Sequence, residues 1–370
     1  MLLAAAGAAG LGFVSFAPNR ILSGRPIPLW EAVGAVTLTV CGAMALTLAI
    51  SVVGARQRWS DWLALAVALA ALIGLPVVAG QAASGLVDGS PARVSLGAGF
   101  WTLLLAAALL GVDALQRLSL PLWLRSAVVI VSPLALLAAG IAGIFDDLSL
   151  AREYANRRDA FLGELGRHVI LVAAAVATAA LIGMPLGIAA RARPRLGSSL
   201  FAVLNLLQTV PSIALFGLLI GPLSLLANSL PILQTLGLRG IGIAPALIAL
   251  VLYSLLPVVR NTQAGLAAVP AAVVEAARGM GMARAQILWR VELPLAWPVL
   301  LAGLRVVTVQ AIGLAVVAAL IGAGGLGTFV FQGLGQNAVD LVLLGALATI
   351  AVALIADFSF QLLIAMAERT

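Results

Sequence analysis

The 370-residue chain has no lysine, one cysteine and one histidine. Without lysine, a phosphate-binding loop of the Walker A type is impossible, so any ATP hydrolysis must take place on another polypeptide. The one cysteine, Cys41, lies in an apolar run and has no partner for a disulfide. One histidine is too few for a Ser-His-Asp triad, and no cluster of His, Cys, Asp or Glu has the spacing of a metal site. We therefore expect no enzymatic chemistry, no metal and no cofactor in this chain.

Charge is scarce as well, because charged residues make up 9% of the sequence and hydrophobic residues 63%. A soluble domain carries about a quarter charged residues, so the composition excludes an ordinary soluble protein. Apolar runs of roughly 20 residues recur along the chain, and each is long enough to cross a hydrocarbon core about 30 Å thick. Their Ala, Leu, Val and Gly content favours helices over the alternating strands of a membrane barrel. The sequence therefore predicts an all-α, polytopic membrane protein.

The apolar runs predict about ten membrane-spanning helices. The first run has no basic segment before it, and Phe16-Ala17-Pro18 is a poor cleavage site, so we expect a span rather than a signal peptide. The expected spans lie at residues 1–17, 32–55, 62–80, 97–113, 121–145, 167–190, 199–223, 242–262, 296–321 and 339–364.

The net charge of +7 is due to arginine alone. A basic balance can indicate nucleic acid binding, but here the arginines lie in short segments between the spans, so we expect no nucleic acid partner. With the N-terminus in the cytoplasm, twelve arginines fall on the inner side, eight on the outer side and Arg305 within a span. This bias places both the arginines of 191–195 and the loop at 263–294 on the cytoplasmic side.

A polar stretch at 146–166 separates two apolar halves of the chain. We expect it to form a short extracytoplasmic surface helix. It would connect an N-terminal five-span extension, residues 1–145, to a second half, residues 167–370.

The loop at 263–294, called here the EAA loop, is polar and glycine-punctuated although it lies between two long apolar runs. Pro270 is placed to begin a short helix that continues to Arg278, because its missing N–H would be unpaired at that position in any case. Gly279 and Gly281 then permit a tight turn and a close backbone approach.

A second short helix is expected over 285–290, ending before Pro294. Met280 and Met282 would offer adaptable apolar contacts to a partner. The side chains expected to pack against the membrane helices are Ile287, Leu288, Val291 and Leu293.

The spacing of the EAA loop resembles the cytoplasmic coupling loop of ABC importer permeases. Glu-Ala-Ala at 275–277 is followed after three residues by Gly281 and after nine more by Val291-Glu292-Leu293-Pro294, where the family usually has isoleucine at the first of these four positions. The resemblance implies that the loop inserts into a cleft on a cytoplasmic ATPase subunit. An amphipathic hairpin on the membrane surface is the plainer alternative, but it does not predict this spacing. The residues that the resemblance assigns to coupling are Glu275, Ala276, Ala277, Gly279, Gly281 and Met282.

Prolines and small or polar residues within spans mark kinks and close helix contacts. They gather at 206–217, which contains Pro211, and again at 252–262 and 319–327. For each polar side chain taken alone, an ordinary hydrogen bond between helices is the alternative to a place in a pathway. The uncharged candidates for a translocation pathway are Gln208, Thr209, Ser212 and Gln310.

Together these segments resemble, over 165–365, the permeases of osmoprotectant importers, which form the glycine betaine, choline and carnitine branch of the ABC family. The first half is similar to the extended, low-affinity betaine-type variant at 16–20, 95–101 and 147–157. The resemblance implies a permease subunit of an ATP-driven importer for glycine betaine or a related quaternary ammonium solute, with the last five spans as a type I importer core.

The same resemblance implies a multi-pass protein of the bacterial inner membrane with several partners. These are cytoplasmic subunits that bind ATP and magnesium, a second permease that is a copy or a paralogue, and an extracytoplasmic substrate-binding protein.

An ion-coupled secondary transporter of five-plus-five inverted repeats is the second hypothesis, because ten spans fit that architecture. It leaves the EAA loop unexplained, and no carboxylate lies securely at mid-membrane for ion coupling. A non-transporting membrane scaffold is the third hypothesis, and it would need neither the loop nor kinked spans.

Arg305 and His168 are two charged or titratable residues that lie within predicted spans. Arg305 lies about nine residues into a span, where a cation costs roughly 2.5–3.5 kcal/mol. We expect its side chain to extend toward the cytoplasmic headgroups, with Asp357 as a possible counter-ion. His168, which follows Arg167 at the start of a span, is expected to be an interfacial residue rather than a ligand or a proton relay.

Overall fold

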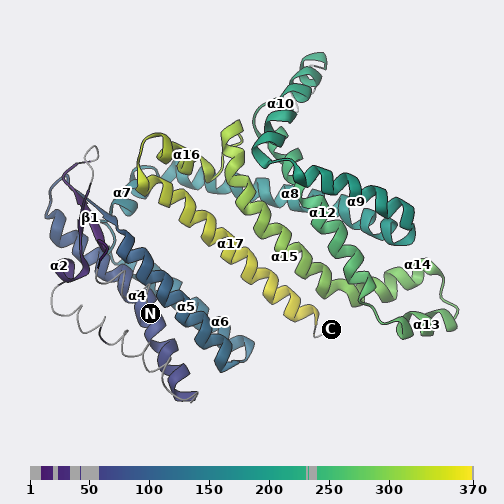
Figure 1. Ribbon diagram of the computed structural model, residues 1–370, viewed down its shortest axis with the longest axis horizontal. Coiled ribbons are helices and arrows are strands. Elements are labelled where there is room, and N and C mark those ends of the chain that lie inside the picture. Colours follow the sequence, from purple (N-terminus) through teal and green to yellow (C-terminus); the bar gives the residue numbers. More distant parts are fainter. Residues whose placement is uncertain are drawn as a thin grey trace. The chain divides into compact units, whose positions relative to one another are not determined.

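The computed structural model describes residues 10–19, 24–33, 42, 58–230, 232 and 240–368 (Figure 1). The chain forms two compact units, Met1–Asn156 and Arg157–Thr370, which are described separately. Across the described residues, eight helices are long and apolar enough to cross a membrane. The predicted helical membrane fold is therefore confirmed.

In the first unit, three long helices follow one another: α4 (Arg58–Val87), α5 (Ala98–Leu118) and α6 (Leu122–Ile141). α4 and α5 meet through small residues. Ala68 and Ala107 are both fully buried, and a Cβ added at Gly111 of α5 would lie 3.4 Å from the Cβ of Ala68. Small side chains let helix backbones approach closely, which is how helices associate where lipid removes the hydrophobic drive.

A three-stranded antiparallel sheet adjoins this helix pair, in the order β2-β1-β3 (Figure 1). Its strands are β1 (Val14–Ala17), β2 (Arg25–Ile27) and β3 (Arg93–Leu96), with Val14 opposite both Ile27 and Leu96. The prediction of a helical span at 1–17 is therefore wrong for its described part. The apolar residues of this run serve the sheet, because Phe13 and Val14 are fully buried in a cluster with α4 and α5 side chains.

The second predicted span, 32–55, lies almost entirely outside the described residues, as does Cys41. A five-residue helix, α2 (Leu29–Val33), reaches its beginning. Each of the other eight predicted spans overlaps one of the eight candidate membrane helices.

A short helix, α7 (Ser149–Asn156), lies within the polar stretch and ends the first unit. It is held to β3 by an ion pair of 2.6 Å between Arg93 and Glu153, whose carboxylate side chain is only 3% exposed. Arg152 pairs with Asp147 at 2.9 Å and also donates to the carbonyl of Ala92. The charges of this stretch are therefore used to fasten α7 to the sheet.

In the second unit, four long helices run side by side (Figure 1): α8 (Arg158–Ala192), α12 (Ile243–Ala267), α15 (Leu293–Val317) and α17 (Val339–Ala367). α8 and α12 cross closely at two glycines. A Cβ at Gly183 would lie 2.7 Å from Val258, and one at Gly187 would lie 2.7 Å from Thr262. Neither position accommodates a larger residue without moving the helices apart.

The predicted span 199–223 is two helices rather than one. α9 (Pro194–Thr209) and α10 (Ser212–Ser229) are separated by Val210, which has an extended backbone with ψ 126°, and by Pro211. Proline lacks an N–H and disfavours the helical conformation of the residue before it, so the helix breaks here instead of bending.

The EAA loop also differs from its prediction in one respect. α13 (Ala271–Gly279) is followed by α14 (Arg284–Ile287), which passes through a π-helical turn (Leu288–Glu292) directly into α15. The second helix therefore does not end before Pro294, and one helical run extends from Arg284 to Ile321 over 38 residues. The π-turn closes the last turn before the proline through a bond from the N–H of Leu293 to the carbonyl of Leu288.

Beyond α15, a 3-10 turn (Ala318–Ile321) leads into a glycine-rich loop and then α16 (Gly327–Gly335). Gly322, Gly324 and Gly325 all have positive φ, between 76° and 86°, which only glycine adopts readily.

Candidate functional site

The turn of the EAA loop is a helix C-terminal motif that requires glycine. The N–H of Met282 donates to the carbonyl of Ala277 at 3.2 Å, and the N–H of Gly281 to that of Arg278 at 2.9 Å. This pair of bonds is the Schellman motif, in which one residue takes the left-handed conformation. Gly281 is that residue, with φ +77°. A Cβ there would meet no atom within 4 Å, so backbone conformation rather than space selects glycine.

Most side chains assigned to coupling face outward from this turn. Glu275, Ala276 and Gly279 are exposed on α13, Gly281 is exposed in the turn that follows, and the neighbouring Met280 is 76% exposed. Ala277 differs because it is only 2% exposed and packs inward, and Met282 is half-buried. The loop thus combines an ordered backbone with a face that its own unit does not cover.

The inner side of the EAA loop is apolar and packed. Leu266, Val269, Ala296 and Leu300 form a buried cluster against which Val274, Leu288, Leu293 and Ile188 pack. Ile287 is 4% exposed, and Val291 is half-buried. The predicted packing of Leu288 and Leu293 is confirmed, and Ile287 is buried as expected.

At its base the loop is joined to α8 by an ion pair. Nη2 of Arg191, in the last turn of α8, lies 3.1 Å from Oε1 of Glu292, the last residue of the π-turn. The two side chains are 34% and 15% exposed.

The helix break between α9 and α10 brings three of the four pathway candidates together: Gln208, Thr209 and Ser212. Nε2 of Gln208 donates to the carbonyl of Tyr253 on α12 at 2.9 Å, and the Tyr253 hydroxyl donates to the carbonyl of Val210. These two bonds fasten the broken helix to α12, so Gln208 fills the structural role that the sequence left open.

The other three pathway candidates do not fasten the helix break to α12. The Thr209 hydroxyl donates within its own helix, to Leu206, at 2.7 Å, and Thr209 is exposed. Ser212 is half-buried at the first position of α10, and Gln310 is exposed on α15.

Tyr253 was not singled out from the sequence, although two general rules point to it. A helix break at Pro211 frees a carbonyl that lipid cannot satisfy, and a tyrosine within a span needs a partner for its hydroxyl. Together, these two rules pair the break at Pro211 with Tyr253, which is the only tyrosine in the segment 252–262.

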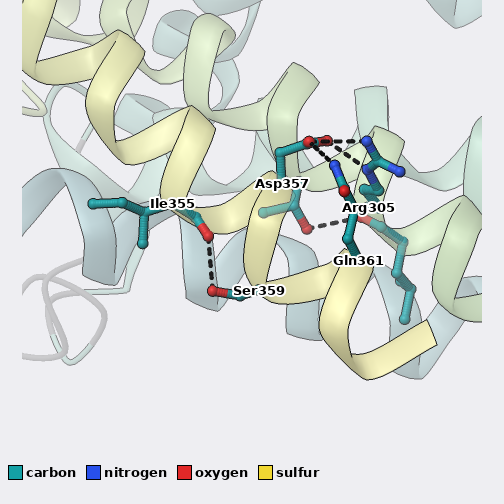
Figure 2. A network of polar contacts seen from close by, with 7 residues as sticks. Arg305, Ile355, Asp357, Ser359 and Gln361 are labelled. Atoms are coloured by element: carbon teal, nitrogen blue, oxygen red, sulfur yellow. Dashed lines mark hydrogen bonds and ion pairs between the residues drawn. The ribbon is translucent and has the colours of Figure 1, made fainter. Parts of the chain in front are cut away.

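Arg305 and Asp357 form a bidentate ion pair between α15 and α17, as Figure 2 shows. Nε and Nη2 of Arg305 lie 2.5 and 2.8 Å from the two carboxylate oxygens, and Nε2 of Gln361 donates to Oδ2 of Asp357 at 2.8 Å. The possible counter-ion is confirmed. The guanidinium fork of Arg305 is thus satisfied by a partner on α17, while its extension toward the headgroups stays a prediction.

His168 is fully buried rather than interfacial, which corrects its prediction. It lies beneath the glycine-rich loop, since a Cβ at Gly325 would be 3.0 Å from its Nδ1. Glu164, one helical turn before it, accepts the N–H of Gly325 and also pairs with Arg167 at 3.1 Å. The sequence does not predict this contact, because the polar stretch 146–166 is expected to be a connector, whereas α8 already begins at Arg158.

No group of three or more His, Cys, Asp or Glu residues in the described part of the chain could hold a metal ion.

Two family models match the chain. Residues 179–366 match the model described as binding-protein-dependent transport system inner membrane component. Residues 1–151 match the model for the N-terminal domain of ABC transporter permease YehY.

Among curated proteins, the osmoprotectant import permease protein OsmW of Salmonella typhimurium is 41% identical over 192 residues, which are 52% of this chain and 84% of OsmW. The choline transport system permease protein OpuBD of Bacillus subtilis is 37% identical over 217 residues, 58% of this chain and 87% of OpuBD. OpuCD of Bacillus subtilis, a glycine betaine/carnitine/choline transport system permease protein, is 37% identical over 209 residues, 56% of this chain and 84% of OpuCD.

Among solved structures, an inward-facing form of the MetNI methionine ABC transporter matches with a TM-score of 0.50 and 20% identity. The match covers 56% of this chain and 95% of the MetNI chain. At this identity the likeness bears on the fold alone, which is that of a type I ABC importer permease. The family model and the curated relatives add the family itself: the chain belongs to the inner membrane components of binding-protein-dependent transport systems, the permeases of ABC importers.

Proposed function

We propose that this permease imports glycine betaine or a related quaternary ammonium solute across the bacterial inner membrane. ATP is hydrolysed on a separate subunit, as in the rest of the family. The observation that carries the substrate class is the set of relatives at 37–41% identity, whose names specify osmoprotectant, choline and carnitine transport. Membership in the permease family replaces both the secondary-transporter and the scaffold hypotheses.

The partners follow from the family and from the outward face of the EAA loop. A cytoplasmic ATPase, holding ATP and magnesium, would receive α13 through Glu275, Ala276 and the turn at Gly281. A second permease and an extracytoplasmic substrate-binding protein would complete the importer. The exposure of Met280, at 76%, supports a partner surface, because a flexible apolar side chain fits such a contact better than it fits water.

We assign the pathway to the candidate side chains that do not fasten the helix break to α12. Thr209 and Ser212, together with Gln310 of α15, are uncharged and could accompany a cationic head group without trapping it. Gln208 holds the break in place through Tyr253 and contributes shape rather than contact.

The test is uptake of labelled glycine betaine by cells that lack other betaine carriers and express the whole system. We expect uptake with the native chain and at least a tenfold loss with Gly281→Trp, because tryptophan at positive φ strains the turn and projects into the docking face. Unlabelled choline and carnitine, added as competitors, would rank the solutes.

Gly89→Trp is the matched control. Gly89 also has positive φ, +72°, with nothing within 4 Å of an added Cβ, but it lies in the first unit between α4 and β3. Normal uptake with Gly281→Trp, or an equal loss with both variants, would contradict the coupling role. Absence of uptake with the native chain would remove glycine betaine and leave the family membership standing.

A further inference from the structure

The base of the EAA loop is joined to α8 by few contacts. Across the described residues, α8 contributes Ile188 to the apolar cluster beneath the loop and Arg191 to the ion pair with Glu292. These two residues are three positions apart, so they share one face of the helix. The loop is thereby attached to a helix other than the two that it connects.

The π-turn sets the direction of the Glu292 side chain. A π-helical turn contains one more residue than an α-helical turn, so every later residue is rotated by about 100° relative to an uninterrupted α-helix. Glu292 is the last residue of that turn, at Leu288–Glu292. With this rotation its carboxylate reaches Arg191, and the side chain is only 15% exposed.

Arg191 depends on this one carboxylate. Its Nη1 is buried and has no hydrogen-bond partner within the part of the chain that the structure describes. Its position in the last turn of α8 is favourable for a cation, because the carbonyl end of a helix carries partial negative charge. Without Glu292, however, a partly buried guanidinium would retain no acidic acceptor and would have to move.

We propose that Glu292 and Arg191 are positioning residues that fix the EAA loop against α8, so that closure of the ATPase moves α8 together with α15. The inference rests on the proposed function, since it assumes that the loop receives the ATPase. It adds a pair of residues outside the docking face, on the membrane side of the loop, to those that determine coupling.

The test uses the whole importer in proteoliposomes, with labelled glycine betaine and ATP hydrolysis measured together. Glu292→Gln is expected to lower the number of molecules imported per ATP about tenfold, the scale of one lost charge-assisted hydrogen bond, while hydrolysis itself continues. The charge exchange Arg191→Glu with Glu292→Arg is expected to restore most of the ratio. Asp113→Asn is the control, because it removes a pair of similar length, 2.9 Å to Arg117, whose side chains are about half exposed.

A second readout does not depend on transport. Spin labels at Ala272 of α13 and Leu181 of α8, both exposed, would be introduced into the assembled importer with Cys41→Ser. Glu292→Gln should broaden the distribution of distances between them, and the charge exchange should narrow it again. If Glu292→Gln does not assemble, Arg191→Gln breaks the same pair from the other side.

An unchanged ratio together with an unchanged distance distribution in Glu292→Gln would overturn the proposal. So would an equal change in Asp113→Asn. A native importer that carries no glycine betaine, while Glu292→Gln still broadens the distances, would refute the proposed substrate and leave the positioning role intact.

Discussion

The EAA loop and the break between α9 and α10 are both irregular, polar segments of the second unit. The polar groups of the break are hydrogen-bonded to a neighbouring helix, whereas those of the loop are exposed. At the break, Gln208 and the carbonyl of Val210 are both bonded to Tyr253 of α12. In the loop, Glu275 and the turn at Gly281 face outward on an ordered backbone. A polar group satisfied within the subunit serves its fold, whereas an exposed one on an ordered loop is available to a partner.

The comparison predicts that changes in the packed interior lower stability and that changes on the loop lower coupling. Three substitutions test it, from the largest expected effect on stability to the smallest.

Asp357→Asn should destabilise the protein most, because it leaves Arg305 without a full counter-charge within the spans. We expect a loss of roughly 2–3 kcal/mol, less than for a fully buried pair because the two side chains are 34% and 29% exposed. Thermal unfolding in detergent, followed by tryptophan fluorescence, measures it. A double-mutant cycle with Arg305→Ala that shows no coupling between the two sites would contradict this ion pair.

Tyr253→Phe should lower the free energy of unfolding by about 1–2 kcal/mol. The variant keeps the ring in its buried site, where the tyrosine is 8% exposed, but leaves the carbonyl of Val210 without its hydroxyl donor. The same unfolding measurement applies, with Ser254→Ala on the adjacent buried position as control. A change below about 0.3 kcal/mol would mean that water or another donor satisfies this carbonyl.

Glu275→Gln should leave the unfolding free energy within about 0.5 kcal/mol of the native value, as is usual for an exposed position. It should nevertheless lower ATP-dependent uptake, because the carboxylate is assigned to the ATPase contact. Measuring the unfolding free energy and the ATP-dependent uptake of the same variant checks both expectations. Lowered stability with unchanged uptake would mean that Glu275 stabilises the fold and does not take part in coupling. The difference proposed between the loop and the helix break would then be wrong.

Sequence reasoning predicted the helical fold, the apolar underside of the EAA loop and the Arg305–Asp357 pair. These features depend on composition, on local spacing or on charge that lipid does not tolerate. The strands at Val14–Ala17 and Arg93–Leu96 were missed because their pairing joins segments about 80 residues apart, and a short apolar strand looks the same as the end of a span.

The break at Pro211 and the π-turn at Leu288–Glu292 were missed for a related reason. Proline within a span permits either a bend or a break, and the outcome depends on whether a neighbouring helix can satisfy the freed carbonyl. Here Tyr253 does so from α12. Likewise, a proline such as Pro294 can end a helix or lie in its first turn, and here the chain continues from the π-turn into α15.

The continuous helical run from Arg284 to Ile321, which includes the π-turn and the 3-10 turn, has a mechanical consequence. At about 1.5 Å per residue its 38 residues extend over about 57 Å, so a tilt of about 5° at one end would displace the other end by about 5 Å. One end begins at the turn of the EAA loop, and the other enters the glycine-rich loop that Glu164 and His168 support. If the ATPase tilts this run at the EAA loop, its far end at the glycine-rich loop would therefore move by several ångströms.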